Sequence, residues 1–300
     1  MILLDLSQVM ISNLMVQLAT TKVTFDENLV RHMVLNSIRS YRMKYGQKYG
    51  ELVICCDDKD IWRKDVFPLY KANRKKSREE SSHDWTNIFE IMAMLRQELL
   101  ETFPYKNIKI DRAEADDVIA SMCHRFGGFS TGYIPTNPDL PSRNVIPVEE
   151  ILILSGDKDF VQLQKYSNVS QYSPIQKNDV RTDNPERYLR SHIMLGDRGD
   201  GVPNFMSDDD TFVANKRQRP ISRKKVEEWS IMKPEDFCDD NMLRGYKRNE
   251  ILVNLDLVPK YIQDATIEMY KNQVPAPRSE ILNYFMKHRL KKLTESIGDF

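Results

Sequence analysis

The 300-residue sequence predicts an α/β protein in which a central sheet of parallel type has helices on both faces and is followed by a smaller all-α domain. In the first 200 residues, short apolar runs alternate with longer amphipathic segments, which is typical of parallel strands joined by helical crossovers. From about residue 185 onward, apolar residues recur at helical spacing. We therefore expect one domain over residues 1–185 and a second over 186–300.

Each expected element rests on the spacing of its apolar residues. Short runs rich in Ile, Leu, Val and Cys predict strands, and apolar residues three and four apart predict helices. The segment 127–148 holds four Pro and three Gly and is predicted to be a surface loop. The strands are expected at Ile2–Leu4, Leu52–Cys56, Asn107–Ile110, Ile151–Leu154 and, more weakly, Val169–Tyr172. The helices are expected over 25–45, 85–100, 114–126, 185–195, 222–232, 249–257, 260–272 and 277–297.

The composition excludes several classes of protein. An apolar content of 41% suffices for a sizeable core and excludes a disordered chain. The four cysteines form no C-x-x-C pair, which argues against a zinc ribbon or a redox motif. Neither a run of about 18 apolar residues nor a signal-peptide pattern is present, so we expect no membrane span and a location in the cytoplasm.

The formal net charge is zero, yet the basic residues are clustered. Residues 62–78 hold seven Lys and Arg against one acid, and residues 215–225 hold six and no acid. A balanced total can therefore hide a basic surface that faces phosphate and an acidic pocket that holds metal.

Acidic residues recur where the expected strands end. Asp5, Asp57 and Asp157 each follow such a strand, and the carboxyl ends of parallel strands meet at one edge of a sheet. So many carboxylates at one edge would repel each other unless cations neutralised them. The candidate metal ligands are Asp5, Asp57, Glu114, Asp116, Asp117, Asp157, Asp159, Asp197 and Asp200.

The sequence shows no histidine or cysteine at ligand spacing beside these acids. The five histidines, His192 among them, are interpreted as structural or solvent-exposed. Ligation by oxygen alone selects Mg²⁺ or Mn²⁺ over zinc. Two such ions can clamp the attacking and leaving oxygens of a phosphodiester, and this chemistry needs no nucleophilic Ser or Cys.

The basic segment 70–78 lies between the second strand and the helix that begins near Trp85. Its position just after Asp57 favours a segment that threads single-stranded nucleic acid over the acidic pocket. Tyr70 is expected to stack on a base, and Lys71 and Arg74 to reach the scissile phosphate. The remaining candidate contacts to nucleic acid are Lys75, Lys76, Lys216, Arg217, Arg219, Arg223, Lys224 and Lys225.

Six stretches in this order resemble the metal-dependent 5′ nucleases, or flap endonucleases, and in particular a bacteriophage RNase H branch of that family. The resemblance extends to the strand at Val169 and to the tail that ends at Phe300. The stretches are Leu-Leu-Asp5, Cys-Asp57, Tyr-Lys71-Ala-Asn-Arg74, Ala-Glu114-Ala-Asp116-Asp117, Ser-Gly-Asp157-Lys-Asp159 and Gly-Asp197-Arg-Gly-Asp200-Gly-Val-Pro.

The resemblance implies a PIN-like nuclease domain with a basic arch over residues 66–84. The C-terminal domain, with a helix-hairpin-helix-like region, would bind duplex DNA. Lys71, Arg74 and Asp157 would be catalytic. The first metal would be held by Asp5, Asp57, Asp117 and Asp157, bordered by Glu114 and Asp116, and the second by Asp159, Asp197 and Asp200.

The implied activity is that of a Mg²⁺-dependent 5′→3′ nuclease, with Mn²⁺ as a substitute for Mg²⁺. It would remove RNA primers from RNA–DNA hybrids, and adjacent DNA, during lagging-strand replication, and would also cut duplex DNA that carries a 5′ flap or end. A non-catalytic, structure-specific nucleic-acid-binding protein on the same fold is the alternative. A haloacid-dehalogenase-like phosphatase is less favoured, because its Asp-x-Asp pair would have to follow the first strand.

The resemblance further implies a monomer in the host cytoplasm if a phage encodes it. The last residues, 298–300, place an aromatic side chain at the end of an amphipathic stretch. We expect Phe300 to be exposed and to help recruit a phage single-strand-binding protein or sliding clamp.

Overall fold

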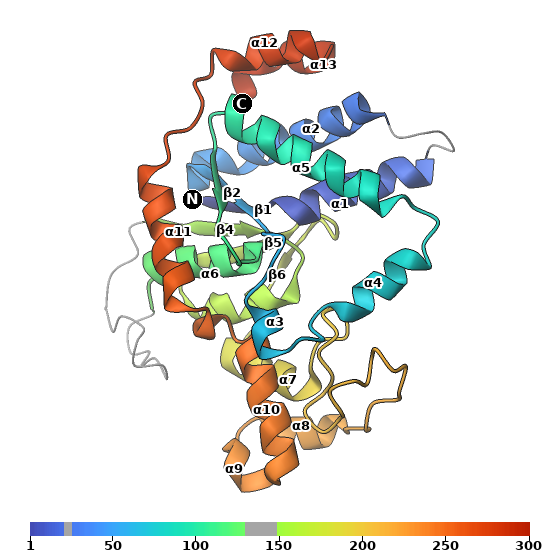
Figure 1. Ribbon diagram of the computed structural model, residues 1–300. Coiled ribbons are helices and arrows are strands. Elements are labelled where there is room, and N and C mark those ends of the chain that lie inside the picture. The colour runs from blue at the N-terminus through green and yellow to red at the C-terminus, as the bar shows by residue number, and fades with distance from the viewer. Residues whose placement is uncertain (21–25, 130–148) are drawn as a thin grey trace.

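The computed structural model describes residues 1–20, 26–129 and 149–300, and a six-stranded sheet lies at its centre (Figure 1). The strand order is β3-β2-β1-β4-β5-β6, in which β6 alone pairs antiparallel. The predicted α/β class is therefore confirmed. The strands are β1 (Ile2–Asp5), β2 (Leu52–Cys56), β3 (Lys106–Lys109), β4 (Ile151–Leu154), β5 (Val169–Ser173) and β6 (Asn178–Val180).

Helices cover both faces of the sheet because alternate side chains of each strand point to opposite faces. Ile2 and Leu4 of β1 belong to one apolar cluster, and Leu3 belongs to another on the opposite face. The first face is covered by α1 (Leu6–Thr20), α2 (Glu27–Tyr49), α5 (Trp85–Thr102), α12 (Glu280–Lys287) and α13 (Lys291–Thr294), and the second by α6 (Ala115–Phe126) and α11 (Lys260–Asn272).

A third apolar cluster lies beyond the carboxyl ends of the strands, in the lower part of Figure 1. Phe205 is fully buried there and contacts the rings of Trp229 and Tyr246 edge-on. The helices of this region are α3 (Arg63–Val66), α7 (Pro185–Leu195), α8 (Arg223–Trp229), α9 (Pro234–Phe237) and α10 (Asp240–Val253), and α4 (Ala72–Glu79) lies beside them. Three 3₁₀ helices complete the described chain: η1 (Lys158–Lys165), η2 (Leu255–Leu257) and η3 (Ile297–Asp299).

Several elements differ from the expectation. Helix α1, which is not among the expected elements, continues directly from β1, and the Asp5 side chain at the end of the strand caps it by accepting from the Gln8 N–H. The stretch 277–297 forms two short helices because Arg289, with a φ of 55°, interrupts it. The helix expected over 249–257 begins earlier, where the Asp239 side chain accepts a hydrogen bond from the Met242 N–H at 2.8 Å. Most of the loop predicted over 127–148 lies outside the described residues.

The C-terminal chain returns to the sheet. Helix α11 packs on α6, whereas α12 and α13 pack near α5 on the opposite face. Phe300 is fully buried, with its ring centroid 5.6 Å from that of Phe103 and 5.3 Å from that of Phe285. The expectation of an exposed C-terminal aromatic is therefore wrong. Among the described helices, none combines the length and apolar character that crossing a bilayer requires.

Candidate active site

The strand order places the acidic residues at one crevice. Strand order reverses direction between β1 and β4, and ligands of open α/β sheets bind outside the carboxyl ends of the strands at such a point. Asp5 ends β1, Asp57 follows β2, and Asp157 lies three residues after β4. The sheet thus brings together three carboxylates that are far apart in the sequence.

Hydrogen bonds hold the carboxylates of β1 and β2 in place. Asp5 accepts from the Gln8 N–H and the Ser155 hydroxyl, each at 3.1 Å. Burial and the nearby charge of Asp57 raise the pKa of Asp5 to about 6. Asp57 accepts from the Ala115 N–H at 2.8 Å, which ties β2 to the start of α6.

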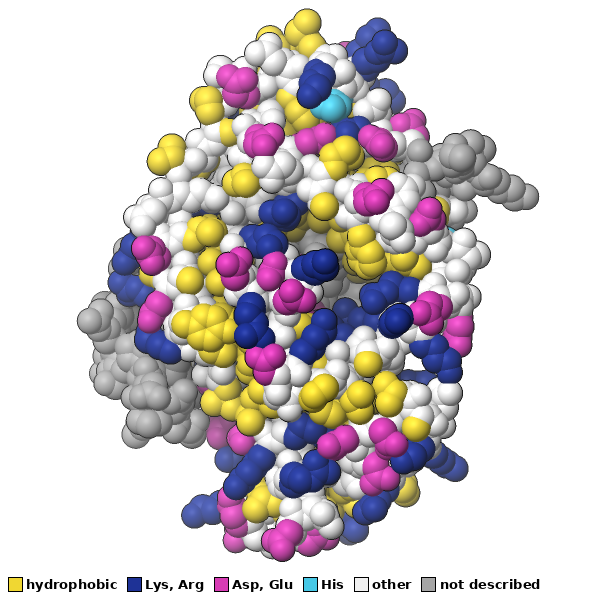
Figure 2. All heavy atoms as spheres, in the orientation of Figure 1, with side chains coloured by type: hydrophobic (Ala, Val, Ile, Leu, Met, Phe, Trp, Pro, Cys, Tyr) yellow, Lys and Arg dark blue, Asp and Glu magenta, His cyan; other side chains and the backbone are white. Residues whose placement is uncertain are grey.

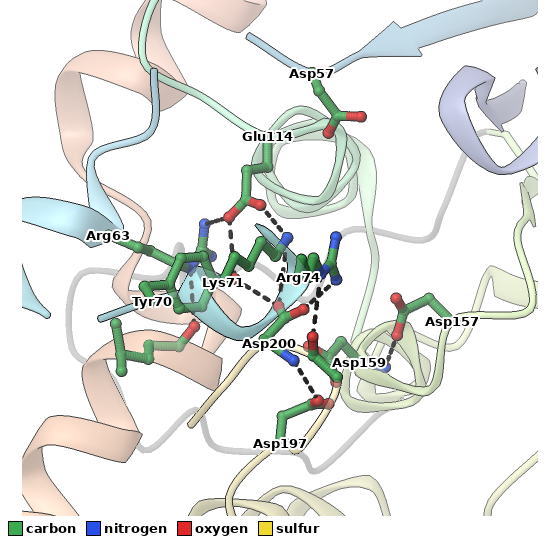
Figure 3. A network of polar contacts seen from close by, with 12 residues as sticks. Asp57, Arg63, Tyr70, Lys71, Arg74, Glu114, Asp157, Asp159, Asp197 and Asp200 are labelled. Carbon is green, nitrogen blue, oxygen red and sulfur yellow. Dashed lines mark hydrogen bonds and ion pairs between the residues drawn. The ribbon is translucent and has the colours of Figure 1, made fainter. Parts of the chain in front are cut away.

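Asp157 and Asp116 complete this first group of acids. Asp157 accepts from the Asp159 N–H at 2.9 Å at the start of η1 (Figure 3). Burial and the charge of Asp159 raise the pKa of Asp157 to about 7. Burial and the charge of Asp157 raise the pKa of Asp116 well above its ordinary value. These carboxylates resist full ionisation without a compensating cation, so the pocket suits a positively charged ligand.

The other two acids of α6 bind a buried arginine. Arg63 is only 2% exposed and donates to Glu114 Oε2 at 2.9 Å, while its second terminal nitrogen lies 2.8 Å from Asp117 Oδ1. Asp117 is fully buried and also accepts from the Trp62 indole N–H at 3.0 Å. The structure therefore separates the acids of this motif: Asp116 interacts with Asp157, whereas Glu114 and Asp117 pair with Arg63. Sequence reasoning missed Arg63 because it resembles its solvated basic neighbours.

Two basic residues of the predicted arch lie over the acids. Lys71 forms an ion pair with Glu114 and lies 3.4 Å from Asp200, and the Arg74 guanidinium pairs with Asp200 (Figure 3). Burial alone would lower the pKa of Lys71, but the charges of Asp200 and Glu114 raise it above its ordinary value. Burial alone would raise the pKa of Asp200, but the charges of Lys71 and Arg74 hold that pKa below its usual range.

Tyr70 lies beneath this arch. Its hydroxyl donates to Asp200 at 2.6 Å and lies 3.2 Å from Glu114, and the residue is only 4% exposed. The structure therefore does not place the Tyr70 ring where a base could stack on it, because the ring fills the third apolar cluster.

A second group of ligand atoms lies beside the first. Asp159, His192 and Asp197 each bring one ligand atom within 4.8 Å of the others. Asp200 is linked to this group because its N–H donates to Asp197 at 2.9 Å. The expectation that no histidine accompanies the acids is therefore wrong. No ligand spacing marks His192 in the sequence, since the fold of α7 and η1 brings it to Asp159.

The two basic segments of the sequence line one groove. A cavity of about 1030 Å³ lies between α4 and the long loop over 196–222 that joins α7 to α8. Asn204 holds this loop together by donating to the Arg219 carbonyl at 2.8 Å. Figure 2 shows Lys and Arg side chains gathered in this part of the visible face. The basic residues that line the groove are Lys75, Lys76, Arg198, Lys216, Arg217 and Arg219.

Arg223, Lys224 and Lys225 are exposed on α8, the helix that follows this loop. They do not line the groove. Arg223 pairs with Glu227 at 3.0 Å on the same helix, so its charge is partly balanced.

Comparisons with known proteins agree with this geometry. Residues 3–190 match the family described as 5′-3′ exonuclease, N-terminal resolvase-like domain, and residues 184–300 match the family described as T4 RNase H, C terminal. The chain is 32% identical to the ribonuclease H of Enterobacteria phage T4 over 309 aligned positions, which cover 99% of this chain and 95% of that protein.

Two solved structures of bacteriophage T5 nucleases share the fold. A flap endonuclease in a pseudo-enzyme–product complex with DNA and metal ions has a TM-score of 0.59 and 15% identity, with 90% of this chain and 97% of that chain covered. A 5′-exonuclease with bound zinc has a TM-score of 0.58 and 15% identity, with 90% and 98% covered.

Proposed function

The chain belongs to the 5′-3′ exonuclease family and is a nuclease of the T4 ribonuclease H type, and we propose that it removes RNA primers and adjacent DNA during lagging-strand replication. In this proposal it hydrolyses RNA–DNA hybrids from the 5′ end and cuts 5′ flaps with Mg²⁺ as cofactor. The observation that carries the proposal is the group of carboxylates formed by buried Asp5 and half-buried Asp116 and Asp157, of which Asp5 and Asp116 lie within electrostatic reach of Lys71.

The residues present fit a pair of divalent cations. Burial first, and neighbouring carboxylates second, raise the pKa of Asp5 and Asp157, so a bound cation would favour their ionised forms. We propose Asp5, Asp57, Asp116 and Asp157 as the residues that hold the first ion, with Glu114 and Asp117 as its border. Asp116 here takes the place that the resemblance implied for Asp117, because Asp117 pairs with the buried Arg63. Asp159, Asp197 and Asp200 would hold the second. When bound, such ions polarise the phosphate and lower the pKa of a bound water.

The chain's own residues position the substrate. Lys71 and Arg74 lie where an incoming phosphate would meet their charges, and a phosphate would compete with Glu114 and Asp200 for them. We propose that they stabilise charge on the reacting phosphate. The Tyr70 hydroxyl donates to Asp200 at 2.6 Å and lies 3.2 Å from Glu114, so it helps to hold these two acids beneath Lys71 and Arg74.

The groove accounts for binding along the strand. Its lysines and arginines come from α4 and from the loop after α7, so a polyanion can contact both at once. We propose that the nuclease domain covers residues 1–185 and that residues 186–300 hold duplex DNA downstream of the cut, partly through Arg223, Lys224 and Lys225. Within 186–300, helices α11 to α13 pack on the sheet, so the part that precedes α11 would contact the DNA. A contact with a single-strand-binding protein or a sliding clamp stays a prediction, and the burial of Phe300 removes the tail as its docking point.

The test is cleavage of a 5′-labelled RNA–DNA hybrid and of a 5′-flap duplex in Mg²⁺ and in EDTA. We expect short labelled products in Mg²⁺ and none in EDTA. Asp157→Asn should abolish them, whereas the matched control Asp60→Asn, an exposed aspartate, should not. Binding of both substrates by the wild type without any product in Mg²⁺ or Mn²⁺ would contradict the proposal.

A further inference from the structure

The group formed by Asp159, His192 and Asp197 departs from the all-carboxylate site that the sequence indicated. Nε2 of His192 lies 2.9 Å from Asp159 Oδ1 and 3.8 Å from Asp197 Oδ2. One nitrogen from α7 and two carboxylates, one from η1 and one from the turn after α7, thus converge on one position.

Two of these atoms lie close to each other but form no aligned hydrogen bond. His192 Nε2 and Asp159 Oδ1 are buried, and neither has an aligned hydrogen-bond partner among the described residues. Buried polar atoms are nearly always paired, so each such atom calls for an explanation. The two atoms lie 2.9 Å from each other, which is an ion-pair distance for a protonated imidazole, although the ring N–H would not point along the contact. For a neutral imidazole, the same arrangement is that of two ligands of a shared cation.

The surrounding chain holds the imidazole in this place. The Tyr188 ring stacks on His192 with centroids 6.1 Å apart and planes 22° apart. The His192 carbonyl accepts from the Gly196 N–H at 2.8 Å. Gly196 has a φ of 68°, and a Cβ there would lie 2.4 Å from the Val202 carbonyl oxygen, so only glycine makes this turn without strain. The turn carries Asp197 back toward His192.

We propose that His192 is a nitrogen ligand of the second metal position, and that this position takes a first-row transition ion such as Mn²⁺ in preference to Mg²⁺. The inference rests on the proposed two-metal function. Mg²⁺ prefers oxygen ligands and gives up its waters reluctantly, whereas imidazole suits transition ions. A site with one imidazole and carboxylates therefore has a larger difference in affinity between Mn²⁺ and Mg²⁺ than a site with oxygen ligands alone.

The test uses Mn²⁺ as the probe and the full chain as the sample. Pulsed electron paramagnetic resonance of bound Mn²⁺ detects a coordinated histidine nitrogen directly, without any reaction. We expect a ¹⁴N modulation in the wild type that changes to the ¹⁵N pattern when the histidines are labelled with ¹⁵N. His192→Gln should lose the signal, and His288→Gln, on another part of the molecule, should keep it. The labelled wild type shows whether any histidine coordinates. If His192→Gln fails to fold, the His→Gln variants of the other four histidines should each keep the signal, which assigns it to His192; loss of the signal in one of them would overturn the proposal.

Calorimetric titration gives a second readout. His192→Gln should lower the Mn²⁺ affinity of one of two sites by at least about 10-fold, since even residues behind the ligands typically contribute that much. The Mg²⁺ affinity should change less, so the ratio of the two affinities falls. Two bound Mn²⁺ ions without a nitrogen signal would overturn the role of His192 alone. A wild type that binds no Mn²⁺ would overturn the two-metal function as well.

Discussion

Replacing Asp5 by Asn should stabilise the metal-free protein at alkaline pH. Asp5 is 8% exposed, and burial together with the charge of Asp57 raises its pKa from 3.8 to about 6. Because the folded-state pKa lies above the unfolded one, ionised Asp5 opposes folding. This opposition is absent below pH 3.8, grows as the pH rises, and is complete above pH 6.

The shift from 3.8 to about 6 corresponds to about 3 kcal/mol of free energy of unfolding. The Asn side chain keeps one oxygen acceptor, so one of the two hydrogen bonds from Gln8 and Ser155 is lost, at a cost of about 1 kcal/mol. We therefore expect Asp5→Asn to be about 2 kcal/mol more stable than the wild type at pH 8. Near pH 4.5 the two effects nearly cancel.

Urea unfolding in EDTA, followed by circular dichroism at pH 4.5 and pH 8, measures this difference. Asp60→Asn, on the exposed surface, is the control and should change stability little at either pH. Added Mg²⁺ should stabilise the wild type more than Asp5→Asn, because a ligand stabilises the state that binds it. An Asp5→Asn protein that is equally destabilised at both pH values would refute the reasoning, since no ionisation penalty would then exist.

Three further predictions follow from the same geometry. Asp157→Asn should reduce turnover by at least about 100-fold while the affinity for DNA in EDTA stays near the wild-type value, since phosphate contacts supply most of that affinity; gel-shift and single-turnover assays on one preparation check this. Lys71→Ala should lower the single-turnover rate, whereas Lys75→Ala, at an exposed position in the groove, should weaken binding and flatten its salt dependence. If the two variants changed the rate and the affinity to the same extent, the separate roles of Lys71 and Lys75 would be contradicted. Phe300→Ala should cost about 3–5 kcal/mol of stability, measured by urea unfolding, and an unchanged midpoint would show that the C-terminus is not packed as described.

Local patterns in the sequence were enough to predict much of the fold. The bounds of β2 and β4 agree with the prediction to the residue, as do those of α7 and α11. These segments have uniform apolar runs or clear helical spacing with Gly or Pro at an end, so neighbouring residues decide their structure. The missed α1 follows β1 without a loop, so the Asp5 cap, with Gln8 three residues later, is the local signal that could have marked its start. Strand β6 has only three residues and carries no such signal.

The candidate acids could also be found from the sequence, because each follows a strand and parallel strands end at one edge. The sequence could not show which acids face each other. Asp116 and Asp117 are adjacent, yet one interacts with Asp157 and the other with Arg63, since successive residues of a helix point about 100° apart.

By itself, the sequence determined the α/β class, the acidic crevice and the two basic segments, because short-range spacing and strand ends carry these features. Only the tertiary structure decided that the basic segments line one groove, that Phe300 is buried and that His192 joins Asp159. Phe300 contacts Phe285, 15 residues before it, and Phe103, nearly 200 residues before it. His192 lies 33 residues after Asp159. The two basic segments are more than 100 residues apart in the sequence. Contacts at such separations depend on how whole elements pack, and no local pattern of apolar residues encodes that packing.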